Sequence, residues 1–107
     1  MDDAEKLLRS WWQSPLKDGA KCEDALRVVV FLGMILKPAN SQGHYHASHP
    51  DLLGNQRFAF GAISINCHAF GVPSKAHPRA IQDILQAAKV IQAAQAQKRL
   101  EDNEQNQ

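Results

Sequence analysis

The chain has 107 residues, the usual size of one domain with one hydrophobic core, so we expect a single domain over residues 1–107. Hydrophobic residues make up 44% of the sequence and charged residues 21%. Both fractions are close to the averages of globular proteins, which argues against global disorder. The formal net charge of +1 is too small to indicate a nucleic-acid partner by itself.

The charges are unevenly distributed along the chain. Between residues 57 and 99, the basic residues are opposed by one acid, Asp83, whereas both ends of the sequence are acidic. A locally basic face can contact phosphates while the total charge stays near neutral.

Nothing in the sequence predicts export or membrane insertion. The first residues, Met-Asp-Asp-Ala-Glu, lack the basic start and apolar core of a signal peptide. The longest apolar run, residues 28–36, is interrupted by Gly33 and is too short to cross a bilayer. Cys22 and Cys67 form no Cys-x-x-Cys pair. We therefore expect a cytoplasmic protein, without membrane contact, whose two thiols are reduced.

The first 20 residues predict an added helix and a linker. Acidic residues begin the segment 2–13, and apolar residues recur in it at helical spacing: Leu7, Leu8, Trp11 and Trp12. Pro15 and Gly19 then interrupt the pattern. Either one of the adjacent tryptophans anchors the helix on the core while the other half-covers it, or the pair forms a docking surface for a partner.

Residues 22–32 predict a second helix. Its buried face would carry Ala25, Leu26, Val29, Val30 and Leu32. The β-branched run at residues 28–30 favours a strand, but Gly33 is well placed to end a helix, so we favour the helix. A strand over residues 34–37 and a turn at Pro38, Asn40 and Ser41 would follow.

Two further strands and a last helix complete the pattern. In a strand over residues 43–48, His44, His46 and Ser48 share one face. In a strand over residues 58–66, Ile63 and Ile65 point inward. After a loop, Pro78 suits the first turn of a helix with buried positions Ile81, Ile84, Leu85, Ala88 and Ile91. Residues 101–107 should form a disordered polar tail.

This order predicts an α+β, two-layer fold. A three-stranded antiparallel sheet would be packed by helices on one face, with an α-β-β-β-α core over residues 22–92 and an extra N-terminal helix.

The histidine-rich segment 42–50, Gln-Gly-His-Tyr-His-Ala-Ser-His-Pro, is the main candidate for chemistry. Histidine exchanges protons near neutral pH and is the commonest metal ligand. The residue types would suit zinc, with His44 and His46 on one strand and Cys67 and His68 after the next, but the spacing matches no zinc signature, and we expect no metal or other cofactor. Cys67 as a nucleophile is disfavoured, because its strand neighbour His68 points to the other face.

Acid–base chemistry on RNA is the third interpretation of this segment. A metal-independent ribonuclease needs a group that deprotonates the attacking ribose 2′-hydroxyl or protonates the leaving oxygen, and histidine suits either role. His44, at the start of a strand, would be that group, with Lys75 and Arg79 as cations. An inert, solvent-facing histidine is the competing interpretation.

The chain resembles the HicA-type toxins, small mRNA-cleaving proteins of bacterial toxin–antitoxin pairs. The similar segments, in order, are residues 31–37 (Phe-Leu-Gly-Met-Ile-Leu-Lys), residues 42–50, residues 63–71 (Ile-Ser-Ile-Asn-Cys-His-Ala-Phe-Gly) and residues 81–88 (Ile-Gln-Asp-Ile-Leu-Gln-Ala-Ala). Together they cover roughly residues 22–90. The chain departs from the family at residues 42–43, where Gln-Gly stands in place of Gly-Ser, and it has longer loops and added helices.

The resemblance implies a fold like that of double-stranded-RNA-binding domains and a metal-independent endoribonuclease that cleaves mRNA. His44 matches the family's catalytic histidine by position, and His46, Lys75 and Arg79 would lie near substrate phosphates. The implied partner is a HicB-type antitoxin that covers the His44 face.

The alternative is a non-enzymatic α+β interaction protein, such as a regulator or a phage-encoded inhibitor, that uses Trp11, Trp12 and the added helices. Homo-oligomerisation through the last helix is compatible with both functions.

Overall fold

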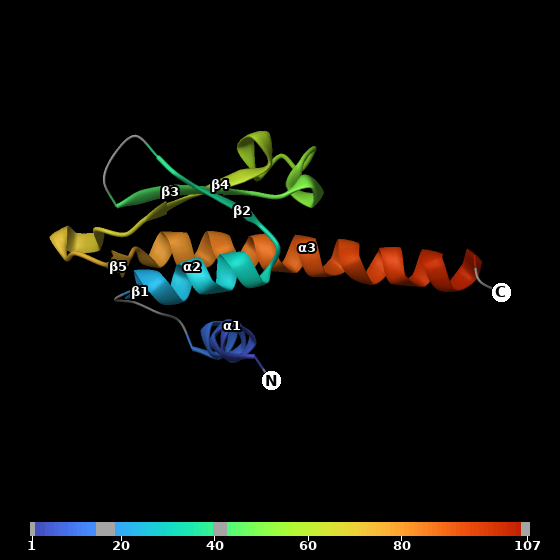
Figure 1. The fold of residues 1–107 in the computed structure, drawn as a ribbon, viewed down its shortest axis with the longest axis horizontal. Helices are drawn as coiled ribbons and strands as arrows, with labels where there is room; N and C mark the ends of the chain where they lie inside the picture. Colours follow the sequence, from blue (N-terminus) through green and yellow to red (C-terminus); the bar gives the residue numbers. More distant parts are fainter. Residues whose placement is uncertain (1, 15–18, 40–42, 106–107) are drawn as a thin grey trace.

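The computed structural model describes residues 2–14, 19–39 and 43–105 (Figure 1). Its helices and strands are α1 (Asp3–Gln13), β1 (Ala20–Lys21), α2 (Cys22–Phe31), β2 (Ile35–Pro38), β3 (His44–Ser48), β4 (Ala62–Asn66), β5 (Lys75–Ala76) and α3 (Pro78–Gln105). Short 3-10 turns connect β3 to β4 and β4 to β5. The predicted turn at Asn40 and Ser41 lies outside the described residues.

The centre of the fold is an antiparallel sheet with the order β2-β3-β4. Helices α2 and α3 lie along one face of this sheet (Figure 1). That face buries Ala47 of β3 and the predicted inward residues Ile63 and Ile65 of β4. The α+β class, with helices on one face of a three-stranded antiparallel sheet, is therefore confirmed.

Helix α1 adds a layer on the side of α2 that faces away from the sheet (Figure 1). The Asp2 side chain caps it by accepting a hydrogen bond from the backbone N of Ala4 at 2.8 Å. Trp11 is buried, whereas Trp12 is 49% exposed. One tryptophan thus anchors the helix and the other half-covers it, as the first interpretation predicts.

Segment 22–31 is a helix despite its β-branched run, and Gly33 follows it with a φ of +79°. The buried stripe is Cys22, Ala25, Val28 and Val29. The prediction that Val30 is buried is wrong, since that side chain is 61% exposed. Each residue turns the helix by about 100°, so a stripe centred on Ala25 and Val28 leaves Val30 on the outside.

Two boundaries differ from the sequence prediction. The strand predicted over residues 58–66 begins only at Ala62, because a 3-10 turn with Phe60 at a φ of +57° occupies residues 59–61. Helix α3 continues to Gln105, so residues 101–105 are helical where a disordered tail is predicted. The strong helix formers Ala, Gln, Lys, Arg and Leu fill the preceding residues 92–100, and the helix continues from them into the polar residues 101–105. No described helix is both long enough and apolar enough to cross a membrane.

A disulfide joins Cys22 at the start of α2 to Cys67 just after β4. The expectation of two reduced thiols is therefore wrong for this structure. Residues 74–75 bring the cysteines together: the N of Cys22 donates to the O of Ser74 at 2.8 Å, and the N of Lys75 donates to the O of Cys67 at 3.1 Å. The pairing of β5 with β1, which sequence analysis did not predict, holds this arrangement in register.

Candidate active site

His44 is the first residue of β3, the middle strand, and its side chain is exposed. It pairs across the ladder with Asn66, the last residue of β4. Strand alternation places both on the face of the sheet opposite α2 and α3, which we call the outer face. No described helix covers this face (Figure 1). His44 is therefore accessible to a large substrate.

His46 lies on the outer face, two residues beyond His44, as predicted. It stands between Lys37 of β2 and Ser64 of β4 in one cross-strand row. Its Nδ1 is 3.4 Å from the Ser64 hydroxyl oxygen. All three side chains are exposed, so the row presents hydrogen-bonding groups and one fixed positive charge beside His44.

The other two predicted residues, Lys75 and Arg79, lie beyond the end of β4 and not on the outer face. Lys75 is a half-buried residue of β5, and Arg79 is exposed in the first turn of α3. A backbone hydrogen bond joins their segment to the strand pair that contains His44. The N of His77 donates to the O of Asn66, the residue opposite His44, at 3.0 Å. The structure thus gathers His44 and His46, and separates them from Lys75 and Arg79.

His68 is a site residue whose position sequence analysis missed. Its ring lies against Gly43, immediately before His44, and a Cβ built on Gly43 would overlap the Cδ2 and Nε2 atoms of that ring. Gly43 also has a φ of +78°, which strongly favours glycine. The imidazole of His68 thus fills the space that the serine expected from the family resemblance would need.

Gly43→Ser is expected to destabilise the protein by about 2–4 kcal/mol, from left-handed backbone strain plus overpacking against His68. The matched control is Gly54→Ser, because Gly54 has a φ of +82° with nothing within 4 Å of a built Cβ. Gly54→Ser should lower the free energy of unfolding only by the cost of the left-handed backbone conformation, about 1 kcal/mol. Urea unfolding of both variants measures the difference.

A double-mutant cycle with His68→Ala isolates the steric part. A coupling of about 1 kcal/mol or more between positions 43 and 68 is expected from the relieved overpacking. An equal decrease in the free energy of unfolding in Gly43→Ser and Gly54→Ser, with no coupling to position 68, would contradict the contact between Gly43 and the His68 ring.

The structure bears on two of the chemistries considered from sequence, metal binding and cysteine nucleophilicity. Among the described residues, no group of three or more His, Cys, Asp or Glu side chains is arranged to hold a metal ion. Cys67 is bonded to Cys22 and carries no thiol.

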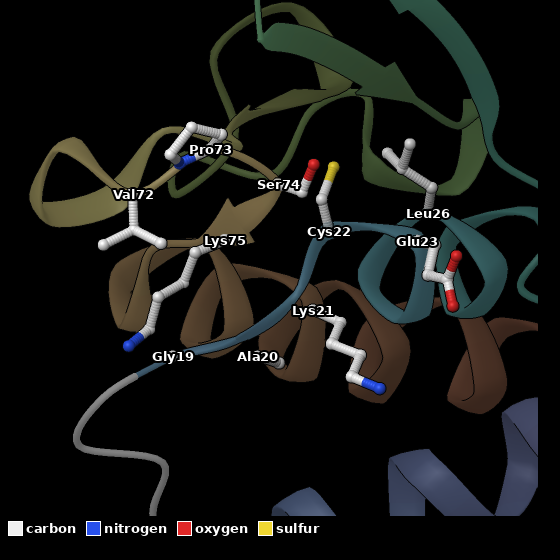
Figure 2. Close-up of a pocket in the computed structure, with 10 residues that line it drawn as sticks. All are labelled: Gly19, Ala20, Lys21, Cys22, Glu23, Leu26, Val72, Pro73, Ser74 and Lys75. Atoms are coloured by element: carbon white, nitrogen blue, oxygen red, sulfur yellow. The ribbon is translucent and has the colours of Figure 1, made fainter.

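Two clefts adjoin the site on the side of the disulfide. The smaller contains Gly43, Tyr45 and His68. The larger lies between the start of α2 and the segment 72–75, and Lys21 and Lys75 line it (Figure 2). The clefts share Cys22, Pro73 and Ser74. A hollowed surface therefore runs from the residue before His44 to the β1–β5 pair.

Comparisons of this chain with protein-family models, with curated proteins and with solved structures found no match.

Proposed function

We propose that this protein is a HicA-like RNA-binding toxin that cleaves mRNA by metal-independent histidine acid–base catalysis. The observation that carries the proposal is the exposed His44 at the start of the middle strand, on a sheet face that no described helix covers. Apart from the two-residue strand β5, the order of elements from α2 to α3 is helix, three strands and helix. A domain like those that bind double-stranded RNA would have the same order, and the family resemblance implies that fold.

In the proposed reaction, the ribose 2′-oxygen attacks the adjacent phosphorus while the bond from phosphorus to the 5′-oxygen breaks. A base removes the 2′-hydroxyl proton, and an acid protonates the leaving 5′-oxygen. His44 performs one of these transfers from the outer face. His46 lies two residues further along the same face of β3, with Lys37 opposite it on β2, and both can donate to the phosphate oxygens, where negative charge develops. The products are a 2′,3′-cyclic phosphate and a 5′-hydroxyl.

Incubation of the purified protein with total RNA in EDTA tests this proposal. The wild type should cleave the RNA, and His44→Ala should not. His46→Ala is the matched control, an exposed histidine on the same face, and it should retain part of the activity. If the wild type leaves the RNA intact, the protein is not a metal-independent ribonuclease.

The proposed partner is a HicB-type antitoxin that covers the His44 face, and the proposed compartment is the cytoplasm, where mRNA is found. Thiol-reducing systems act there against exposed disulfides. Cys22 and Cys67 are 8% and 3% exposed, and this burial limits access to the bond.

A non-enzymatic interaction protein is the second candidate, and exposed apolar side chains favour it. Trp12 is 49% exposed, Leu53 64% and Phe60 95%. Large exposed aromatic residues are enriched at protein interfaces. Absence of cleavage by both wild type and His44→Ala would favour this function.

A further inference from the structure

Phe60, in the connection between β3 and β4, combines two features that do not stabilise the fold. Its side chain is 95% exposed, and its backbone is left-handed, with a φ of +57° and a ψ of +24°. That conformation is unfavourable for residues that carry a Cβ atom, and bulky residues seldom adopt it. Residues held in such conformations cluster at functional sites. Phe60 is therefore a candidate for contact with a ligand.

The turn that carries Phe60 is held by buried and hydrogen-bonded neighbours. Phe58 is buried, its N donates to the O of Asn55 at 3.0 Å, and the N of Gly61 donates to the O of Phe58 at 3.2 Å. The Leu53 side chain lies beside Gly61, with its Cδ2 atom 3.0 Å from a Cβ built there. An aromatic ring presented on a preformed turn loses less entropy when it binds a ligand.

The strand register places this turn at one end of the outer face and His44 at the other. The β3–β4 ladder runs from the pair of His44 and Asn66 to the pair of Ser48 and Ala62. Four residues at about 3.3 Å each separate the two pairs by about 13 Å. Beyond the second pair, the N of His49 donates to the O of Gly61, the residue after Phe60, at 3.1 Å. The connection rises from the sheet on the side away from α2 and α3 (Figure 1).

The outer face between the two ends suits a polyanion. Its outward positions on the three strands are Ile35, Lys37, His44, His46, Ser48, Ala62, Ser64 and Asn66. None of these residues is acidic, and Lys37 carries a fixed positive charge. Residues 52–61 add Arg57 and no acid. The acid just before them, Asp51, has a side chain that is 13% exposed and pairs with Lys98 at 3.1 Å.

The combination of Phe60 with this face favours an unpaired RNA strand as the ligand. Aromatic side chains stack on the faces of unpaired bases, which a duplex hides. The core of a protein–protein interface is apolar and is depleted of lysine and serine. The outer face beside Phe60 instead presents Lys37, Ser48 and Ser64, which fits a sugar–phosphate backbone better than a protein surface.

We propose that Phe60 stacks on an unpaired base of single-stranded RNA whose backbone crosses the outer face to His44. The inference rests on the proposed function, and it goes further by assigning an unpaired strand as the substrate and Phe60 as a residue that binds it. The stacked base belongs to a nucleotide a few positions from the cleaved phosphate, because the ladder between Phe60 and His44 is about 13 Å long.

The test is binding of the full chain to a short, fluorescein-labelled, single-stranded 2′-O-methyl RNA, which lacks the attacking hydroxyl and stays intact. Anisotropy titrations compare wild type with Phe60→Ala, which should bind about ten-fold more weakly because one stacked base is lost. Trp12→Ala is the matched control and should bind like wild type. It removes an exposed aromatic side chain from α1, which lies on the side of α2 away from the sheet.

The salt dependence of binding separates stacking from charge. The Phe60 ring is uncharged, so Phe60→Ala should keep the wild-type slope of log K against log salt. Lys37→Ala should reduce the magnitude of that slope by about 0.7. Phe60→Trp keeps an aromatic face and should bind at least as tightly as wild type. Phe60→Leu keeps apolar surface without that face and should bind as weakly as Phe60→Ala.

Thermal melting separates a binding role from a structural one. Phe60→Gly removes the ring and also suits the left-handed backbone, so it should keep or raise the melting temperature while it weakens binding. Wild-type affinity in Phe60→Ala or Phe60→Leu would overturn the inference. Absence of RNA binding by wild type, the result expected if Phe60 contacts a protein instead, would also overturn it. Phe60-dependent binding by a wild type that does not cleave RNA would support the inference and refute the proposed catalysis.

Discussion

His44→Ala should abolish growth arrest when the protein is expressed in bacteria, and should lower the RNA cleavage rate by about 100-fold or more. A positioned acid or base contributes about 10²–10⁴ to the rate. The side chain is exposed and has no role in the core. The variant should therefore unfold at the same urea concentration as wild type.

His46→Ala is the control for this experiment. It removes a neighbouring histidine that is also exposed, and with it the contact to Ser64. Partial loss is expected, since His46 contributes a hydrogen-bond donor and not the proton transfer itself. Growth arrest by His44→Ala at the wild-type level would remove His44 from the mechanism.

Reduction of the disulfide should lower the free energy of unfolding by about 4 kcal/mol at 25 °C, from the chain-entropy relation for a cross-link between residues 45 positions apart. The intact disulfide lowers the conformational entropy of the unfolded chain, and reduction restores that entropy. Urea unfolding with and without dithiothreitol measures the change. Thiol titration of the unfolded protein should find no free thiol before reduction.

The double variant Cys22→Ser, Cys67→Ser is the control for the reductant. Its free energy of unfolding should be about that of the reduced wild type, and dithiothreitol should not lower that free energy further. Two titratable thiols in the protein as purified, with equal stability in both conditions, would show that the bond is not formed in solution.

The sequence predicted the elements that are built from local patterns. The alternation in residues 43–48 placed His44 and His46 on one face and Ala47 on the other, and the structure has this arrangement. The helical spacing from Ile81 to Ile91 identified the buried side of α3. Such patterns are readable because one periodicity determines both the element and its buried face.

The features that were missed depend on contacts between distant segments. The disulfide forms only if the start of α2 lies beside the end of β4, and no local sequence pattern predicts that these two segments are neighbours. The same holds for the ring of His68 against Gly43 and for Lys21 opposite Lys75. Strands of two residues carry no detectable alternation, so β1 and β5 were not predicted.

The most direct measurement of the proposed mechanism compares an RNA oligonucleotide with the same oligonucleotide carrying one 2′-deoxyribose at the mapped cleavage site, both in EDTA. The proposed mechanism predicts cleavage of the RNA, products that end in a 2′,3′-cyclic phosphate and a 5′-hydroxyl, and no cleavage at the deoxy position. Cleavage at the deoxy position, or cleavage that requires a divalent metal ion, would contradict it.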